Sequence, residues 1–480
     1  NAFNTLNEVP ATGSKFLQRD ILKGDWGFEG FVVSDWGSIG EMIPHGYAKD
    51  GVHAAELAAN AGSDMAMESS LYVRQLQGLV AEGKVDISVI DDSVKRILGV
   101  KYDLGLFEDP YKYCDLEREE NVIGSKENNL AALDMAKKSI VLLKNESSLL
   151  PIKKKGQKIA LIGHLANDNN SPLGNWRGAA DSNTAVTVLK GLENYGSNSI
   201  TYRKGVDLYY GETNFHNRVK LNHTDRTGFK AAKIAAKSAD VVIMVLGEEG
   251  FQSGEGRSRT ELGLPRLQQE LLEEVFKVNK NIVLVLMNGR PLNLTWADQN
   301  IPTIVEAWHL GTQSGNAIAE VLYGNYNPSG KLTMSFPRNV GQVPLYYNYK
   351  KTGRPGASSA EVTRSTYADV ENSPLYPFGY GLSYTSFEYS DLTISSDEIS
   401  RGDVIKASVK ITNTGKLKGK DVVQMYIRDH YGSLARPVKE LKGFELVELN
   451  PGETKEVSFE IDNSNSIGFN FCLTDFFLFS

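Results

Sequence analysis

The stretch GFVVSDWG, residues 30–37, decides the first interpretation of this chain. Its apolar, β-prone residues 31–33 run directly into Ser34 and Asp35. Such a run is typical of a strand that is buried on both faces in a parallel sheet. In α/β architectures the chemistry lies at the carboxyl ends of these strands. The stretch therefore predicts an α/β fold that presents the Asp35 carboxylate at a functional edge.

Trp36 follows Asp35 directly, and an indole ring suits stacking on the apolar face of a sugar. A carboxylate beside an aromatic ring at a strand end suggests the nucleophile of a glycosidase. Two structural alternatives stay open at this point. Asp35 can instead cap the following helix, as Asp often does, and Trp36 can be a buried core aromatic.

The composition restricts the class of protein. With 480 residues the chain is long enough for about three domains. A net charge of −7 argues against nucleic acid or an anionic membrane as a partner. The two cysteines, Cys114 and Cys472, have no metal or redox spacing, and a disulfide between them stays open. The seven histidines show no ligand spacing either, so we expect no metal and no cofactor.

Short β-branched runs alternate with helical patterns between residues 129 and 340. This alternation predicts an α/β/α sandwich, a mainly parallel sheet with helices on both faces. The predicted strands cover residues 158–164, 240–249, 281–289 and 302–309, and the predicted helices cover residues 228–238, 265–279 and 312–323.

The pattern changes to a period of two from about residue 386. Ile405, Ala407, Val409 and Ile411 alternate with polar residues, which is typical of strands with one buried face. Residues 386–480 therefore predict a small antiparallel sandwich. Tyr-, Pro- and Gly-rich residues 341–385 are interpreted as an extended linker, and the charged residues 114–128 as a second linker.

Three long segments of the chain resemble glycoside hydrolase family 3. They are residues 1–50, residues 323–348 (YGNYNPSGKLTMSFPRNVGQVPLYYN) and residues 373–390 (SPLYPFGYGLSYTSFEYS). The resemblance extends from residue 1 to about residue 462 and is greatest to the bacterial β-glucosidase branch with a C-terminal fibronectin type III-like domain. It implies that residues 1–113 form the C-terminal part of a (β/α)₈ barrel, and that residues 386–480 form the fibronectin type III-like domain with an atypical last strand.

The resemblance also implies an N-terminally truncated chain. A complete barrel takes about 250 residues, and only about 110 residues precede the second domain here. In the family, a Lys-His pair and an Arg that hold the sugar lie in the upstream part. The Phe-rich tail, residues 469–479, departs from the family pattern. A periplasmic or secreted location is favoured by the resemblance alone.

Glycoside hydrolysis needs two carboxyl groups across the scissile bond. The resemblance makes Asp35 the nucleophile. A glycine-rich loop after the predicted strand at residues 240–249 offers candidates for the acid/base, and the family motif selects Glu255, with Glu248 as the runner-up. Without the motif, each Glu of this loop is better interpreted as a solvated charge.

Phe3 and Trp36 are the predicted substrate-binding residues. The resemblance implies that many family members have Tyr at the position of Phe3, where it contacts the sugar or the nucleophile. Because Phe cannot donate a hydrogen bond, we expect Phe3 to pack only. We expect Arg257 and Arg259 to pair with loop carboxylates rather than to face the substrate.

The resemblance implies a retaining exo-β-glycosidase. The predicted activity is that of a β-glucosidase, which removes terminal non-reducing β-D-glucosyl residues from oligo- or aryl-β-glucosides by double displacement. A β-xylosidase of the same family is the enzymatic alternative. A catalytically inactive fragment with a carbohydrate-binding or interaction role is the alternative from another class. A homo-oligomer stays open.

Overall fold

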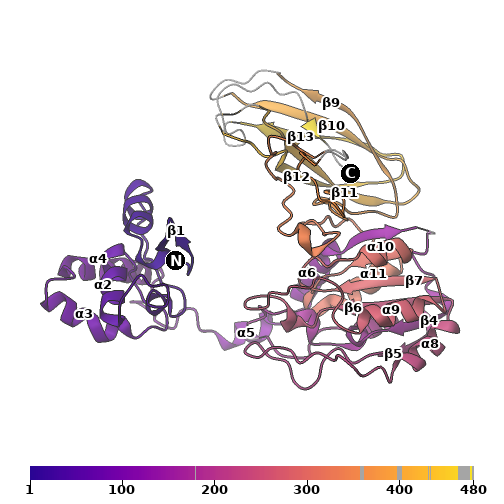
Figure 1. The fold of residues 1–480 in the computed structure, drawn as a ribbon, viewed down its shortest axis with the longest axis horizontal. Coiled ribbons are helices and arrows are strands. Elements are labelled where there is room, and N and C mark those ends of the chain that lie inside the picture. The colour runs from indigo at the N-terminus through magenta and orange to yellow at the C-terminus, as the bar shows by residue number, and fades with distance from the viewer. Residues whose placement is uncertain are drawn as a thin grey trace. The chain divides into compact units, whose positions relative to one another are not determined.

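The computed structural model describes residues 1–146, 148–178, 180–356, 362–396, 403–430, 432, 434–462 and 476–477. It divides the chain into two units, residues 1–123 and residues 124–480 (Figure 1). Cys114 is exposed, whereas Cys472 and most of the tail that we interpreted as atypical lie outside the described residues. No helix of the described residues is long and apolar enough to cross a bilayer.

The first unit is built mainly of helices around small alanine-rich clusters. Helix α2 buries Ala54, Ala55 and Ala58 completely, begins at the Asp50 cap and ends at Gly62. Gly62 has φ +105°, a conformation that favours glycine and stops the helix. The elements are β1 (Thr5–Leu6), β2 (Val9–Pro10), η1 (Ala11–Gly13), the π-helical η2 (Phe16–Asp25), α1 (Ser38–Glu41), α2 (Gly51–Ala61), α3 (Leu71–Ala81), α4 (Ile87–Asp103) and α5 (Leu116–Val122). Helix α5 lies within residues 114–128, which we interpreted as a linker.

The predicted strand at residues 31–33 forms only a short pairing in this unit. Residues 31–33 and 63–67 share one parallel bridge, between Val33 and Met65. Beside it, the Asp64 carboxylate accepts the Val32 amide at 2.8 Å, so a side chain replaces the backbone partner of a longer ladder. The Asp64 carboxylate is also bound by Lys23 at 2.7 Å. A parallel pairing is therefore present, but it is too short to form regular strands.

The second unit contains a six-stranded sheet in the order β3-β8-β7-β6-β4-β5. All neighbours are parallel except β3, which runs antiparallel to β8, so the predicted mainly parallel sheet is confirmed. Strand β6 is buried at every residue, because helices cover both faces of the sheet. The strands are β3 (Val141–Asn145), β4 (Lys155–Ile162), β5 (Ser197–Arg203), β6 (Val241–Gly247), β7 (Ile282–Met287) and β8 (Thr303–Glu306).

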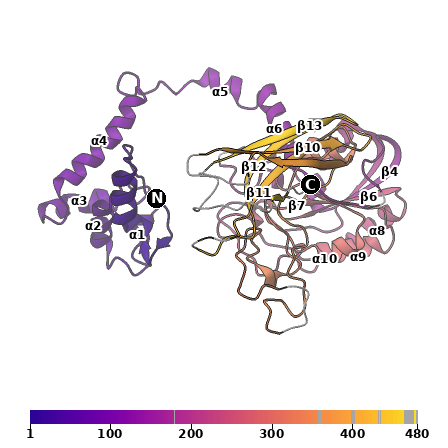
Figure 2. The same ribbon diagram turned by 90° about the horizontal axis from the view of Figure 1, so that it is seen from above.

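The helices of this unit form two layers. Helices α8, α9 and α10 contribute to the apolar core on one face of the sheet (Figure 2), and α6, α7 and α11 contribute to the core on the other face. The predicted α/β/α sandwich is confirmed. The helices are α6 (Lys126–Ser139), α7 (Val188–Tyr195), α8 (Phe229–Lys237), α9 (Gln268–Phe276), α10 (Thr295–Asn300) and α11 (Ser314–Leu322), with short turns η3 (His164–Asn167), η4 (Ser171–Leu173), η5 (Gly250–Gln252), η6 (Gly311–Gln313) and η7 (Val340–Gln342).

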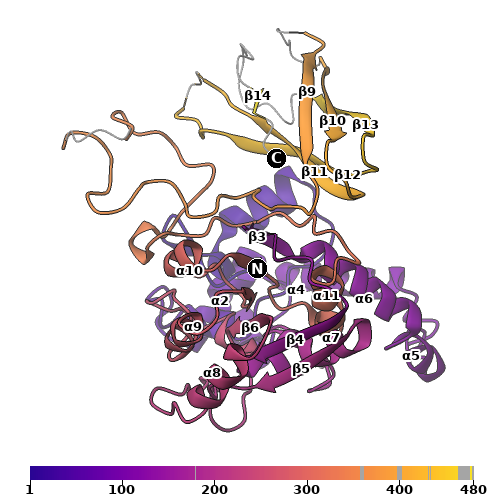
Figure 3. The ribbon, with the colours of Figure 1, turned by 90° about the vertical axis from the view of Figure 1, so that its right-hand side faces the viewer.

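The C-terminal part of the same unit is an antiparallel sandwich, as the period of two predicted. One sheet has the order β13-β10-β9 and the other β12-β11-β14, and Figure 3 shows the two sheets apart from each other. Val409, Ile411 and Val423 lie in the core between them. The strands are β9 (Phe387–Ile394), β10 (Ile405–Asn413), β11 (Gly419–Ile427), β12 (Glu440–Leu449), β13 (Thr454–Ile461) and β14 (Phe476–Phe477).

The sandwich is joined to the α/β part by buried polar and aromatic contacts. Lys331 Nζ lies 2.8 Å from Asp421 Oδ1, and both side chains are almost fully buried. Tyr347, from the extended segment, stacks on Phe378 at a centroid distance of 4.0 Å and meets the edge of Tyr426 in β11. We call this set of contacts the seam. It shows that residues 341–385 pack against both neighbouring parts.

Candidate active site

Asp35 is held at the carboxyl end of the short parallel pairing in the first unit. The Ser34 amide donates to Met65 O at 2.8 Å, and the next residue is Asp35. The half-buried Asp35 carboxylate accepts the Trp36 amide at 2.6 Å through Oδ1. The N-cap of α1 is Gly37, with φ +70° and no side-chain cap, so the alternative in which Asp35 caps this helix is not observed.

Trp36 and Phe3 are the two predicted substrate-binding residues of this unit. The Trp36 ring is 64% exposed, so within residues 1–123 it is not a core aromatic. Phe3 is half-buried. The segment that carries Phe3 lies beside that of Asp35, because the backbone nitrogen of Asn1 donates to Val33 O at 2.8 Å.

The second set of candidates lies on a loop after β6, residues 248–261, which we call the acidic loop. Gly247 ends β6 with φ +144°, and a Cβ there would lie 2.0 Å from Met287 O. Only glycine allows the backbone of β7 to approach this closely at the residue where the loop begins. The acidic loop belongs to residues 124–480, whereas Asp35 belongs to residues 1–123.

Glu248, the runner-up for the acid/base, is completely buried. Arg259 Nη1 lies 2.8 Å from Glu248 Oε1, and Arg290 Nε lies 3.0 Å from the same oxygen. The backbone oxygen of Glu248 contacts His309 Nε2 at 3.2 Å. The Glu248 carboxylate, bound to both guanidinium groups, holds the two ends of the loop together. Because it has no exposed surface, a substrate has no access to it. The expected pairing of Arg259 with a loop carboxylate is confirmed.

Glu249 is also buried, but its environment is different. Its Oε2 accepts the Phe251 amide at 2.7 Å, and the Glu249 amide donates to Gln252 Oε1 at 2.8 Å, which forms a capping box for η5. Burial raises the pKa of the Glu249 carboxyl to about 7, and hydrogen bonds from Thr213 and Phe251 offset only part of this shift. Glu249 therefore fixes the first turn of the acidic loop.

Glu255 differs from both, because its side chain is exposed. Among the described residues no ion pair reaches its carboxylate, and Arg257 Nη1 contacts only its backbone oxygen, at 3.3 Å. Glycines with φ +107° and +66° flank it at positions 254 and 256. Arg257 otherwise donates to the carbonyl oxygens of Phe251 and Phe215, so the expected pairing of Arg257 with a loop carboxylate is wrong. Of the three glutamates at 248, 249 and 255, only Glu255 is available to a ligand.

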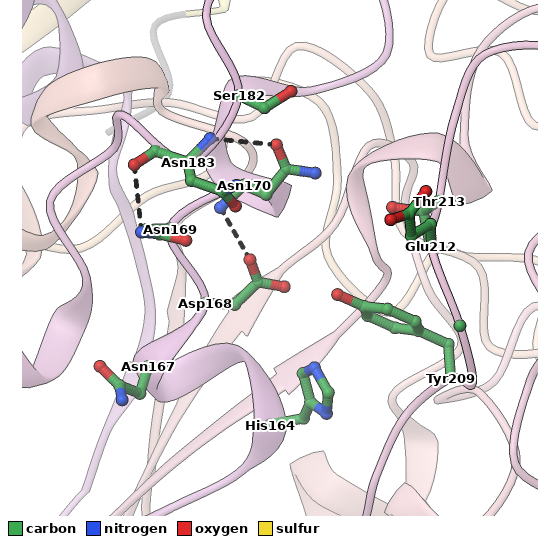
Figure 4. A pocket seen from close by; sticks show the side chains of 11 residues that line it. His164, Asn167, Asp168, Asn169, Asn170, Ser182, Asn183, Tyr209, Glu212 and Thr213 are labelled. Atoms are coloured by element: carbon green, nitrogen blue, oxygen red, sulfur yellow. Dashed lines mark hydrogen bonds between the residues drawn. The ribbon is translucent and has the colours of Figure 1, made fainter.

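A polar pocket of about 550 Å³ lies beside the acidic loop, between the connections that follow β4 and β5 (Figure 4). Asp168 orients one wall, accepting the Asn170 amide at 2.8 Å and the Ser171 hydroxyl at 2.6 Å. The His164 and Tyr209 rings lie together on another wall, with centroids 4.8 Å apart. Thr213, which lines the pocket, hydrogen-bonds to the Glu249 carboxyl of the acidic loop. The amide and hydroxyl groups that line the pocket can bind polar ligands.

Sequence reasoning did not identify the segment that packs under the acidic loop. Asn175 and Trp176 follow β4 after a long connection, and a Cβ at Gly254 would lie 2.7 Å from Asn175 Cγ. Trp176 is 69% exposed. An exposed Trp in an Asn- and Gly-rich connection is the signal in the sequence that could have found it.

Comparisons with known proteins address the family of the chain. The glycosyl hydrolase family 3 N-terminal domain model matches residues 1–100, the C-terminal domain model matches residues 140–384, and the fibronectin type III-like domain model matches residues 421–468. The C-terminal domain model also covers residues 341–384, which we interpreted as an extended linker.

Relatives match along almost the whole chain. A periplasmic β-glucosidase from Salmonella typhimurium is 45% identical over 474 residues, and a β-xylosidase from Formosa agariphila is 38% identical over 470 residues. These alignments cover 96% and 95% of this chain, and 62% of each relative. The chain therefore spans less than two thirds of the length of these relatives.

Solved structures agree with this relationship. A β-glucosidase from Listeria innocua superposes with a TM-score of 0.88 at 38% identity, covering 96% of this chain and 62% of that one. The Listeria enzyme has also been solved with glucose and, as a mutant, with laminaribiose. The chain belongs to glycoside hydrolase family 3.

Proposed function

We propose that the protein is a retaining exo-β-glucosidase in which Asp35 is the nucleophile and Glu255 the acid/base. One observation carries the choice of acid/base: Glu248 is sealed by two arginines, whereas Glu255 is exposed on a glycine-rich loop. The β-glucosidases among the relatives support the choice of activity.

In this proposal the reaction proceeds by double displacement. The Asp35 carboxylate, oriented by the Trp36 amide, attacks the anomeric carbon while Glu255 gives its proton to the leaving oxygen. Glu255 then removes a proton from water, which hydrolyses the glycosyl-enzyme and returns Asp35. The glycines that flank Glu255 allow its loop to adjust to the bound sugar.

The two roles are separated by Asp35→Ala and Glu255→Ala. Asp35→Ala should abolish covalent labelling by a 2-fluoro-β-glucoside, because no nucleophile remains. Glu255→Ala should keep activity on aryl glucosides with good leaving groups, because such leaving groups need no proton. Azide should also rescue this variant. Glu248→Ala is the matched comparison. Azide rescue of Glu248→Ala, but not of Glu255→Ala, would reverse our assignment.

The assay needs two forms of the protein, because the chain spans 62% of the length of its relatives. We would measure p-nitrophenyl β-glucoside hydrolysis by the 480-residue chain and by the complete product of its gene. We expect little or no turnover by the chain alone and robust turnover by the complete product. Turnover by neither form would refute the proposed activity and leave a carbohydrate-binding role. The anomer released first, read by proton NMR, tests retention.

A β-xylosidase is the second candidate, favoured by the 38% identity to the Formosa β-xylosidase. The two sugars differ by the hydroxymethyl group of glucose. The ratio of kcat/KM for the p-nitrophenyl glucoside and xyloside decides between them. A ratio below one would replace glucose by xylose in our proposal.

A further inference from the structure

Glu255 lies in a short exposed turn of the acidic loop. The Arg257 amide donates to Gly254 O at 3.3 Å and closes this turn. Gln252 and Ser253, which precede the turn, are each only 7% exposed, so the turn begins at a buried base. The glycines on either side of Glu255 both have positive φ, and such backbone is easily displaced. A proton donor needs a fixed position, so the turn needs support from outside its own residues.

The Arg290 guanidinium, which follows β7, supplies this support by binding the backbone on both sides of Glu255. Its Nη2 donates to Gln252 O and, at 2.9 Å, to Arg257 O. Its Nε lies 3.0 Å from Glu248 Oε1, so the buried carboxylate at the start of the loop holds the same side chain. Because a guanidinium is planar and rigid, it fixes the two carbonyl groups between which the turn lies.

Arg290 is itself held by the ends of β7 and β8. The Asn288 side-chain amide donates to Arg290 O at 2.8 Å and to Glu306 Oε2 at 3.2 Å, and Asn288 and Glu306 are completely buried. A Cβ at Gly289 would lie 2.0 Å from Ser253 Oγ, so the residue before Arg290 lies directly against the base of the turn. The contacts of Arg290 are therefore built on buried strands of the sheet, as precise placement of a side chain requires.

We propose that Arg290 positions Glu255 for proton transfer to and from the reacting oxygen. This inference rests on the proposed function, in which Glu255 is the acid/base. A general acid must lie within hydrogen-bond reach of the oxygen that it protonates, and a displacement of about 1 Å can cost about a hundredfold in rate. Arg290 is a positioning residue and not a catalytic one, because its donors bind backbone carbonyls and the Glu248 carboxylate.

Arg259 provides a matched comparison in the same cluster. Both guanidinium groups bind Glu248 Oε1, and the side chains of Arg259 and Arg290 are 19% and 18% exposed. Arg259 differs in its other contact, which is to Gly263 O at 3.0 Å, beyond the end of the acidic loop. Replacing either arginine removes a similar ion pair, but only the replacement of Arg290 releases the two carbonyls around Glu255.

The test compares Arg290→Lys and Arg259→Lys in the complete gene product. Lys keeps the charge beside Glu248 but lacks the planar set of donors. We would measure kcat/KM for phenyl β-glucoside, whose leaving group needs a proton, and for 2,4-dinitrophenyl β-glucoside, whose leaving group does not. Arg290→Lys should lower kcat/KM at least about tenfold for the first substrate and less than about threefold for the second. Arg259→Lys should change both by the same factor.

Hydrolysis of the glycosyl-enzyme gives a second readout, because Glu255 also acts there as the base. With the dinitrophenyl substrate this step becomes slow when Glu255 is misplaced, so kcat and KM should fall together in Arg290→Lys. Azide should raise kcat again, because this anion attacks the anomeric carbon without a base and displaces the Asp35 carboxylate. A smaller folded fraction would change neither KM nor the response to azide. Arg290→Gln should show the same selectivity and serves as the second replacement.

A double variant decides whether Arg290 acts through Glu255. In the Glu255→Ala background, Arg290→Lys should lower kcat/KM for phenyl β-glucoside by no more than about twofold, because no acid remains to be positioned. Equal losses for both leaving groups, the same selectivity in Arg259→Lys, or additive losses in the double variant would overturn the inference. If Glu255→Ala itself does not discriminate between the leaving groups, the proposed function fails and the role of Arg290 fails with it. Selectivity in Glu255→Ala without selectivity in Arg290→Lys would refute only the role of Arg290.

Discussion

Replacing Glu249 by Gln should stabilise the protein at alkaline pH and change little at acidic pH. The Glu249 carboxyl is completely buried, and burial raises its pKa from the ordinary 4.5 to about 7. When the pH rises above 7, the folded protein must hold a buried charge that the unfolded chain holds in water. Gln keeps an oxygen for the Phe251 amide but cannot ionise.

The size of the effect follows from the two pKa values. The folded state binds more protons than the unfolded state between pH 4.5 and 7, so the contribution of Glu249 to stability is present at low pH and is lost as the pH rises through 7. Between pH 5 and pH 8 the loss is about 2.5 kcal/mol, since one pKa unit corresponds to about 1.4 kcal/mol. Glu249→Gln should avoid this loss.

Urea unfolding of wild type and Glu249→Gln at pH 5 and pH 8 tests this prediction. The difference in unfolding free energy between the two proteins should grow in favour of the variant by about 2.5 kcal/mol from pH 5 to pH 8. Glu212→Gln, which removes an exposed carboxyl of a neighbouring connection, is the control for the loss of one negative charge. A difference that stays constant with pH, or that favours wild type at pH 8, would refute the reasoning.

Three further substitutions test other features of the fold. Glu248→Ala should cost about 3–5 kcal/mol in urea unfolding, because two guanidinium groups lose their partner, whereas Glu255→Ala should stay within about 0.5 kcal/mol; equal effects would contradict the different burial of the two residues. Gly247→Ala should lower the melting temperature by more than about 5 °C, because its Cβ would collide with a carbonyl oxygen, while Gly263→Ala, with open space around it, should not. Asp64→Asn should increase proteolysis of residues 1–123 markedly, since it breaks a buried ion pair; unchanged proteolysis would show that this pair is dispensable.

The central strands could be predicted because burial on both faces makes their sequences uniformly apolar. The run at residues 240–249 became β6, and the run at 281–289 became β7. The edge strand β5 was not predicted, because its residues alternate between exposed and half-buried and carry mostly polar side chains. The sequence predicted a strand at residues 31–33, but no local pattern shows that the distant Asp64 carboxylate accepts the Val32 amide and leaves a single bridge there.

The candidate site was predictable only in its residue types and motif. The sequence left Glu248 and Glu255 as alternatives, because the partners that bury Glu248 come from 11 and 42 residues further along the chain. Such contacts depend on how β6, β7 and the acidic loop meet in space. The neighbourhood of Trp176 and Phe215 was invisible for the same reason, since two separate connections create it.

The seam limits how freely the C-terminal sandwich can be exchanged between proteins. Lys331 and Asp421 lie on opposite sides of it, so a chain cut before the sandwich would leave a nearly buried lysine without its carboxylate. The segment that carries Tyr347 and Phe378 would lose its aromatic neighbour as well. Gene fusions and deletions that treat the sandwich as a separable tag should therefore produce insoluble or protease-sensitive α/β domains. Recombination breakpoints between functional relatives should fall outside the part of the chain that carries the seam, from Lys331 to Tyr426.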